Sequence, residues 1–256
     1  MSLRLTKKKL KDKAFNPIAR VKGGKYNKYF ISHNIEPDLG MTEFKLPEEE
    51  KKSKLILLPD FRKGIYDKIL ASGVSGSGKS TVIASFIKEY RRRYPDTQVV
   101  IFSSVKQDKT LDVFDPIRPD LDFYLEEPLS PEDLEDTIVI FDDIATIMDK
   151  KTKKAVAALQ DNISECGRHY GITVLSTSHI LFNYGETKKM LNESTLTVLF
   201  PQAGQRAHID RFLKTVCGLE KHLIKKFFDM GKKSRYVGIK RQYAPYFISE
   251  KEIVLV

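Results

Sequence analysis

The sequence of 256 residues lacks three features that would each define a class of protein. Its apolar runs, such as 55–58 and 138–141, are far shorter than the roughly 20 residues that cross a bilayer, so we expect no membrane span. No apolar segment follows the Lys-rich N-terminus, which argues against a secretory signal. Two cysteines, Cys166 and Cys217, cannot build a disulfide framework, and this scarcity favours a reducing compartment.

The composition is that of a globular chain, with 41% hydrophobic and 30% charged residues. The net charge of +10 is unevenly distributed: residues 1–30 carry +9, residues 201–256 carry +7, and residues 31–200 carry −6. Basic ends favour contact with a polyanion. Two other interpretations stay open, a solvated tail at residues 1–13 and an ordinary half-buried hairpin near the C-terminus. The hairpin interpretation concerns the aromatic residues that alternate with basic ones there, which are Tyr236, Tyr243, Tyr246 and Phe247.

From residue 65 the apolar pattern alternates between strands and helices, as is typical of a mostly parallel sheet flanked by helices. Expected strands cover 66–72, 97–102, 137–141, 172–175, 196–200, 235–240 and 246–249. Expected helices cover 80–93, 150–166, 206–216 and 219–229, and one more begins at Ser130 and Pro131. We therefore divide the chain into a basic arm or small β subdomain (1–64), an α/β core (65–204) and basic C-terminal helices and strands that complete the core (205–256).

The turn after the first core strand fits the pattern GxxxxGK[ST], between an expected strand and an expected helix. Its glycines allow backbone N–H groups to point at phosphate oxygens, and the following helix adds its positive dipole end. Lys79 is expected to reach the β- and γ-phosphates, and the Ser80 hydroxyl to bind Mg²⁺. The alternative is a glycine-rich turn that binds nothing. The expected nucleotide-binding residues are Gly73, Val74, Ser75, Gly76, Ser77, Gly78, Lys79, Ser80 and Thr81.

The apolar strand at 137–141 ends in two carboxylates, Asp142 and Asp143. Such a pair at the carboxyl edge of an α/β sheet is the Walker B arrangement. Asp142 is expected to hold Mg²⁺, through water, and Asp143 to orient or deprotonate the attacking water. A helix N-cap followed by an acidic residue is the structural alternative. The sequence contains no [NT]KxD motif, which disfavours a GTPase.

Arg168 follows Gly167, an expected helix C-cap, and would therefore be exposed. Such an arginine can enter the site of a neighbouring subunit and neutralise charge on the γ-phosphate, or it can simply satisfy helix carbonyls. The next strand ends in polar residues at the same sheet edge. Ser178 or His179 is expected to sense the γ-phosphate or the attacking water.

Four segments together resemble the poxvirus-type DNA-packaging ATPases of large eukaryotic DNA viruses, a branch of the FtsK–HerA superfamily of P-loop ATPases. They are GVSGSGKST at 73–81, IVIFDD at 138–143, ECGRHYGITVLSTSH at 165–179 and LNESTLTVLFPQAG at 191–204. The resemblance covers roughly residues 65–250. The second Walker B acid is Asp, as in this branch, and the sensor strand ends in Ser-His where Gln is common in the superfamily.

The resemblance implies a RecA/FtsK-like P-loop fold and an ATPase that uses ATP and Mg²⁺ to thread double-stranded DNA into a capsid. It also implies a homo-oligomeric ring, a pentamer or hexamer, with capsid or portal components as partners, located in the viral factory of the host cytoplasm or in the virion. Lys79 and Ser80, the acids Asp142 and Asp143, and Arg168 match the family's positions. Two alternatives are a P-loop nucleoside or nucleotide kinase without a DNA partner and a non-catalytic protein that binds nucleotide as a structural element.

Overall fold

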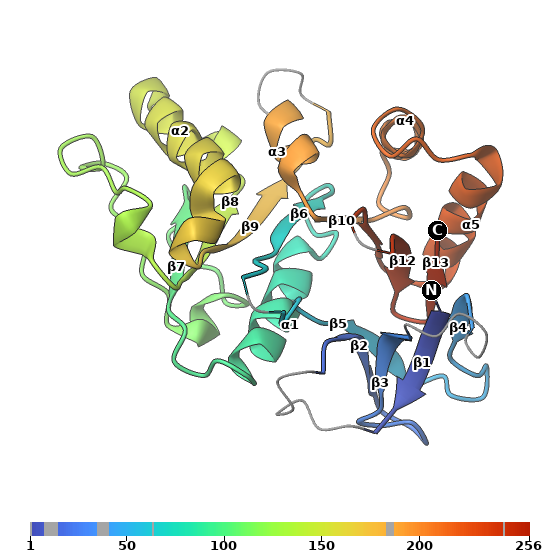
Figure 1. Cartoon of the computed structure of the whole chain (residues 1–256). Coiled ribbons are helices and arrows are strands. Elements are labelled where there is room, and N and C mark those ends of the chain that lie inside the picture. Colours follow the sequence, from blue (N-terminus) through green and yellow to red (C-terminus); the bar gives the residue numbers. More distant parts are fainter. Residues whose placement is uncertain (1, 8–14, 35–40, 63, 183–186, 243) are drawn as a thin grey trace. The chain divides into compact units, whose positions relative to one another are not determined.

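The computed structural model describes residues 2–7, 15–34, 41–62, 64–182, 187–242 and 244–256. The chain forms two compact units (Figure 1). The central unit consists of Lys63–Thr197, and the terminal unit combines Met1–Arg62 with Val198–Val256.

Four parallel strands form the sheet of the central unit, in the order β6-β9-β8-β7. They are β6 (Lys68–Ser72), β7 (Val99–Ser103), β8 (Ile138–Asp142) and β9 (Thr173–Ser178). The apolar part of β8 is fully buried, as predicted for a continuously apolar strand that is covered on both faces. The register brings the carboxyl ends of all four strands to one edge of the sheet.

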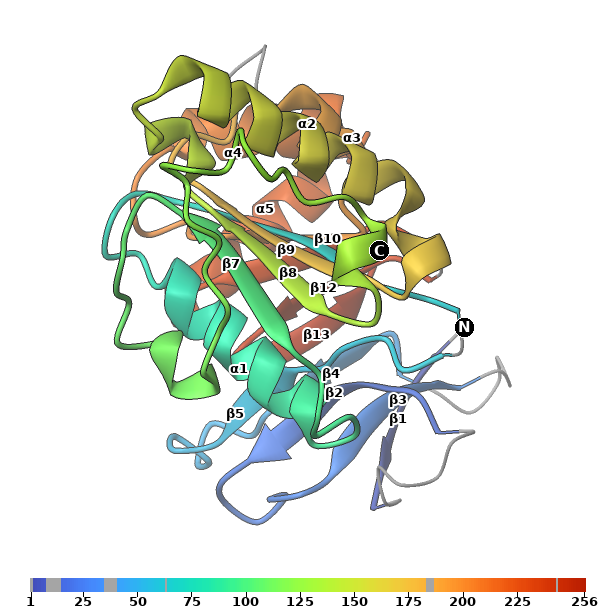
Figure 2. The same cartoon turned by 90° about the vertical axis from the view of Figure 1, so that its left-hand side faces the viewer.

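Two helices cover opposite faces of this sheet, α1 (Lys79–Arg91) and α2 (Lys150–Cys166) (Figure 2). The inner face of α2 packs Val156, Leu159 and Ile163 against the apolar side chains of β7, β8 and β9. Its N-terminus is capped by Asp149, whose carboxylate accepts a hydrogen bond of 2.6 Å from the Thr152 N–H. The parallel sheet and its two helical layers confirm the predicted α/β class.

Shorter elements connect these layers. They are the 3₁₀ helices η2 (Asp112–Phe114), η3 (Glu132–Leu134), η4 (Ile144–Thr146) and η5 (Gly167–Tyr170), and the helix α3 (Lys188–Glu193). Strand β10 (Leu196–Leu199) carries the chain from the central into the terminal unit.

The α-helix expected to begin at Ser130 and Pro131 is wrong, because only the single turn of η3 forms there. The backbone N–H and the hydroxyl of Ser130 both donate to Asp133 Oδ2, at 2.8 Å each. Asp136 then adopts a left-handed conformation, with φ of 55°, before β8 begins at Ile138. The distance in sequence to β8 is too short for a longer helix.

The terminal unit contains two antiparallel groups of strands. In the first the order is β1-β3-β2-β5, formed by β1 (Ser2–Thr6), β2 (Pro17–Lys22), β3 (Phe30–Asn34) and β5 (Lys54–Leu57). In the second, β4 (Glu43–Lys45) pairs with β13 (Glu252–Leu255), which pairs with β12 (Tyr246–Ser249), which pairs with β11 (Val237–Lys240). The described part of residues 1–64 is thus rich in β-strands.

Two helices complete the terminal unit, α4 (Arg206–Thr215) and α5 (Lys221–Lys233). Phe227 of α5 contacts Phe247 of β12 edge to face, with ring centroids 5.3 Å apart. Tyr236 and Tyr246 are also buried, which supports the interpretation of the C-terminal aromatic residues as an ordinary packed hairpin. Tyr243 lies outside the described residues.

Within the described ranges, no helix is both long enough and apolar enough to cross a bilayer.

The close approach of α5 to the turn after β10 gives a test of the packing. A β-carbon added at Gly231 would lie 2.7 Å from both Cβ and Cγ of Pro201. Gly231→Ala should therefore lower the free energy of unfolding by about 1–2 kcal/mol, because overpacking outweighs the roughly 1 kcal/mol that alanine gains in a helix. Urea denaturation measures this change. In a Pro201→Gly background, which lacks both of these carbons, Gly231→Ala should cost much less, whereas a Gly231→Ala protein more stable than wild type would contradict this packing.

Candidate functional site

The turn between β6 and α1 has the backbone that a phosphate loop needs. Gly76 and Gly78 adopt positive φ angles of 73° and 113°, in the region where glycine is favoured. No side chain caps the N-terminus of α1, and its first turn holds no acidic residue. The positive end of the helix is therefore left to an external anion.

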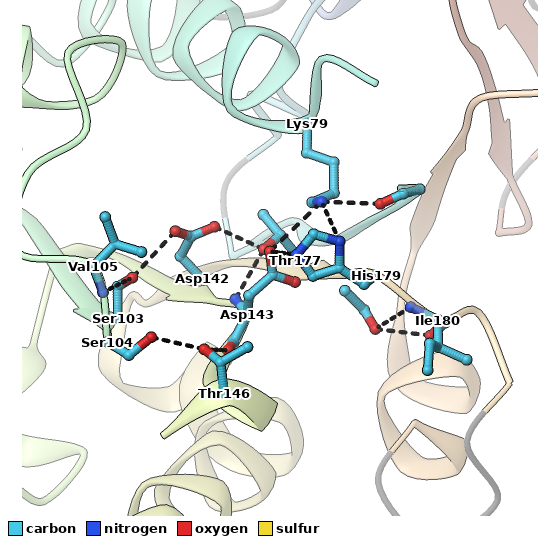
Figure 3. A network of polar contacts seen from close by, with 12 residues as sticks. Lys79, Ser103, Ser104, Val105, Asp142, Asp143, Thr146, Thr177, His179 and Ile180 are labelled. Carbon is cyan, nitrogen blue, oxygen red and sulfur yellow. Dashed lines mark hydrogen bonds and ion pairs between the residues drawn. The ribbon is translucent and has the colours of Figure 1, made fainter. Parts of the chain in front are cut away.

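Lys79, the first residue of α1, turns back into this loop and is only 8% exposed. Its Nζ donates to the Gly73 carbonyl at 2.9 Å and lies 3.5 Å from Asp143 Oδ2 (Figure 3). It also lies 3.4 Å from His179 Nδ1. The ammonium group is thus held at the carboxyl edge of the sheet, between the phosphate loop and the acids that follow β8.

Asp142, the last residue of β8, is held by a hydroxyl group on each side. Thr177 Oγ1 of β9 donates to Asp142 Oδ1 at 2.7 Å, and Ser103 Oγ of β7 donates to Oδ2 at 3.2 Å. Both partners lie on the strands that flank β8, so the sheet register sets the orientation of this carboxylate.

Asp143 occupies a strained position, with a left-handed φ of 45°. Its N–H donates to Thr177 Oγ1 at 2.9 Å, and its Oδ2 lies 2.8 Å from His179 Nε2. Burial raises the pKa of the Asp143 carboxyl, and the charge of Asp142 adds to this, while Lys79 and His179 oppose it. A carboxyl with a raised pKa is better suited to accept a proton at neutral pH than an ordinary aspartate.

The two sensor candidates occupy different positions. His179 bridges Asp143 and Lys79 through its two ring nitrogens. Both contacts are hydrogen bonds when Nε2 donates to the carboxylate and Nδ1 accepts from the ammonium. Ser178 instead closes a local turn, donating to the Ile180 carbonyl at 2.7 Å and accepting from the Ile180 N–H. Of the two, the structure brings only His179 to the lysine and the acid.

The other residues of the loop differ in exposure. Ser77 is buried, Gly78 and Ser80 are half-buried, and Val74, Ser75, Gly76 and Thr81 are exposed. Ser80 lies in the first turn of α1, next to Lys79. No group of three or more His, Cys, Asp or Glu side chains that could hold a metal occurs in the described part of the chain. The Ser80 hydroxyl and the Asp142 carboxylate nevertheless suit Mg²⁺, which keeps several waters and binds one or two protein oxygens together with substrate phosphates.

Arg168 is exposed and lies in η5, which leads into the amino end of β9. The site lies at the carboxyl end of the same strand, about 20 Å away for six residues of β-strand. Gly167 is the C-cap of α2 as expected, but with a right-handed φ of −55°; the left-handed residue of this turn is Gly171, with φ of 70°. Arg168 therefore cannot serve the site of its own chain.

Two hydroxyl residues at the site, Thr177 and Ser103, are not among the residues predicted from the sequence. Thr177 is only 3% exposed and links the side chain of Asp142 to the backbone of Asp143. Its alternation with Ser176 and Ser178 along β9 is the signal that could have identified it, because Ser176 faces away and accepts a hydrogen bond from Gln160.

No protein-family model matches the chain. The chain is 34% identical over 241 residues to a protein of Sputnik virophage described as uncharacterized protein V3, and the alignment covers 93% of this chain and 94% of that protein. The chain belongs to the family of virophage V3.

Two of the solved structures that are similar to this chain are as follows. The genome packaging NTPase B204 from Sulfolobus turreted icosahedral virus 2, in complex with sulfate, is 13% identical with a TM-score of 0.49, covering 73% of this chain and 96% of B204. The pCW3 conjugation coupling protein TcpA is 12% identical with a TM-score of 0.47, covering 92% of this chain and 75% of TcpA. Both TM-scores lie below 0.5, and the fold and the site described above do not depend on them.

The double role of Thr177 gives a prediction for the site. Thr177→Val keeps the shape of the side chain but removes the hydroxyl, so the orientation of Asp142 and the backbone of Asp143 both lose a partner. For a site that hydrolyses nucleotide with Mg²⁺, the expected result is a rate about 10- to 100-fold lower and a higher Mg²⁺ concentration at half-maximal rate. Steady-state assays over a Mg²⁺ titration measure both quantities.

Thr177→Ser is the matched control, because it restores the hydroxyl and should recover most of the rate. If Thr177→Val and Thr177→Ser proved equally active, the hydroxyl would have no positioning role.

Proposed function

We propose that this chain hydrolyses ATP and uses the energy to move double-stranded DNA, as the genome-packaging motor of a virus. The observation that carries the proposal is the convergence of Lys79, Asp143 and His179 at the end of a glycine loop. A buried lysine at a helix N-terminus supplies positive charge for a triphosphate, and the acid next to it supplies a base.

Lys79 is the residue that would change partners when ATP binds. Its present contacts, to the Gly73 carbonyl and Asp143, are ones that the oxygens of a β- or γ-phosphate can replace. The exchange would remove Lys79 from Asp143 and leave the contact between His179 Nε2 and the carboxylate in place.

Asp143 is the proposed general base. Its raised pKa favours proton transfer from a water molecule at the γ-phosphate, and the bond from His179 keeps the carboxylate oriented. Thr177 would hold the backbone of Asp143 in its left-handed conformation throughout. The chain's own residues thus supply positioning, a proton acceptor and positive charge, which are the main contributions to phosphoryl transfer.

Ser80 and Asp142 are the proposed magnesium residues. Mg²⁺, when bound, would neutralise charge on the β- and γ-phosphates. Asp142 is oriented in advance by Thr177 and Ser103, so little reorganisation is required of it.

The DNA-moving part of the proposal is supported by the four sequence segments that resemble packaging ATPases and by the viral origin of the V3 relative. A ring of subunits would explain why Arg168 is exposed far from its own site, because the arginine could then enter a neighbour's site. We propose the same setting as for that family: a ring of five or six copies, capsid or portal partners, and a location in the viral factory or the virion.

The kinase alternative has less support, because Arg91 and Arg92, which lie at the end of α1 and would be candidates to close over phosphates, are engaged elsewhere. Arg91 donates to the carbonyls of Thr97 and Phe114, at 2.9 to 3.0 Å. Arg92 pairs with Glu89 at 3.2 Å. The third alternative, a non-catalytic nucleotide-binding protein, does not explain why two adjacent carboxylates with hydroxyl partners lie beside the loop.

Replacing the lysine tests the nucleotide site directly. Lys79→Ala should reduce ATP hydrolysis by about 100- to 1,000-fold and weaken nucleotide binding, because no other described cation contacts the loop at this position. Hydrolysis is measured by phosphate release with and without long duplex DNA, and binding by a fluorescent ATP analogue. Lys88→Ala, an exposed position on the same helix, is the control. Wild-type turnover in the Lys79→Ala protein would refute the site.

Mixing subunits tests the proposed role of Arg168. Arg168→Ala should keep ATP binding but lose turnover by about 10³-fold or more, since the arginine would act on a neighbour's γ-phosphate. When this variant is mixed with wild-type protein, ATP turnover should fall more steeply than the fraction of wild-type subunits does. Lys154→Ala, which replaces another exposed cation of the region, should not have this effect. A linear decline on mixing, or full activity of Arg168→Ala, would contradict action between subunits.

A further inference from the structure

The two helices of the terminal unit bury one face each and leave the other to solvent. α4 buries Ile209, Phe212 and Leu213, and α5 buries a similar apolar set. Figure 1 shows the two helices in the red part of the chain. A cavity of about 510 Å³ opens between their outer faces, and charged side chains of both helices line it.

The helical period gathers the charged side chains into two stripes along this cleft. On α4, Arg206, Asp210 and Lys214 follow at intervals of four residues, and all three line the cavity. On α5 the corresponding stripe begins with Lys221 and Lys225 and ends at Lys232, a rise of about 16 Å along the helix axis.

Positive charge exceeds negative charge in the cleft. Five lysine or arginine residues line it against two aspartates, and one of these, Asp229, already pairs with Lys232 at 2.7 Å. Lys214, Lys221 and Lys225 are exposed and form no ion pair with any described residue. The cleft therefore has a surplus of cations that the terminal unit does not neutralise.

Two of these lysines also violate the ordinary electrostatic preferences of a helix. Lys221 and Lys225 are like charges at i and i+4, a spacing that destabilises an isolated helix. Lys221 further lies in the first turn of α5, at the positive end of the helix; the adjacent acid, the N-cap residue Glu220, contacts His222 at 3.2 Å. Local rules are broken in this way most often at functional sites, and a bound polyanion would remove both penalties.

The aromatic chemistry of the cleft favours a phosphate backbone over exposed bases. Its aromatic side chain, Phe228, is 5% exposed, and the guanidinium of Arg206 lies 4.1 Å from the ring centroid. A site for single strands usually offers free aromatic faces on which bases stack. Here the only ring lining the described cleft is buried and covered by a cation.

We infer that the α4–α5 cleft binds the phosphate backbone of double-stranded DNA without regard to sequence. The 16 Å stripe of α5 is long enough to meet several phosphates of a duplex, which carries one charge per about 1.7 Å of its axis. The inference rests on the proposed function for its choice of partner. Its physical basis lies entirely within the terminal unit and is independent of nucleotide hydrolysis.

Fluorescence anisotropy with a labelled duplex of about 40 base pairs tests the inference on the full chain, without nucleotide and over a salt series. In the triple variant Lys214→Gln, Lys221→Gln, Lys225→Gln, affinity at about 0.1 M salt should fall roughly 10- to 100-fold. The slope of log affinity against log salt should become less steep by about 3. These side chains are exposed, so the fold should persist, which circular dichroism checks.

Two further variants separate the cleft from the general charge of the protein. Lys22→Gln, Lys51→Gln, Lys52→Gln removes the same charge from other exposed positions of the terminal unit and should leave the salt slope nearly unchanged. Asp210→Asn removes a negative charge from the cleft and should tighten binding about 1.5- to 5-fold.

Several outcomes would overturn the inference. They are no binding of duplex DNA by wild-type protein, equal losses in the two triple variants, and tighter binding of single-stranded DNA or of RNA than of duplex. Because binding is measured without nucleotide, a protein that binds duplex through the cleft but hydrolyses no ATP would refute the proposed function alone. A protein that hydrolyses ATP but binds duplex equally well in both triple variants would refute the cleft alone.

Discussion

The arrangement of the site depends on a single buried ammonium group, that of Lys79. An isolated charge at this depth would be costly, and the loop carbonyl of Gly73, the carboxylate of Asp143 and the ring of His179 together compensate it. The Gly73 carbonyl accepts a buried hydrogen bond of 2.9 Å, whereas the carboxylate oxygen of Asp143 lies 3.5 Å away. The ammonium group is therefore stabilised by the chain's own residues, and its longer contact is available for exchange with a stronger anion.

A second constraint is the register of the four parallel strands, because it determines which side chains lie next to each other at the site. β8 lies between β7 and β9, so its terminal acid receives one hydroxyl from each neighbour, Ser103 and Thr177. The strained backbone of Asp143 follows directly, with its N–H fixed by the same threonine. The orientation of Asp142 is thus set by rigid strands and not by a loop.

Much of the fold and of the candidate site could be predicted from the sequence, and the features that could not be predicted have physical reasons. The glycine loop, the α/β alternation and the paired acids depend on local patterns of three to eight residues, and the structure places them together as expected. Thr177 was missed in a polar run although strand alternation separates it from Ser178, because identifying the hydroxyl that faces Asp142 also requires knowing that β9 pairs with β8. The helix expected at Ser130 stops after the single turn of η3 because β8 already begins at Ile138. Whether Arg168 acts on a neighbour depends on contacts between chains, which a single sequence does not encode in any local pattern.

The composition of the terminal unit has a consequence for synthesis on the ribosome. Its strand β4 pairs with β13, so residues near 44 cannot find their partner until residues near 253 have emerged. The whole central unit, Lys63–Thr197, is translated in between, which takes roughly 7 to 30 s at ordinary elongation rates. The central unit is contiguous and can fold as it emerges, while β4 waits for β13. The candidate site is thus ready to form before the other unit has all of its parts.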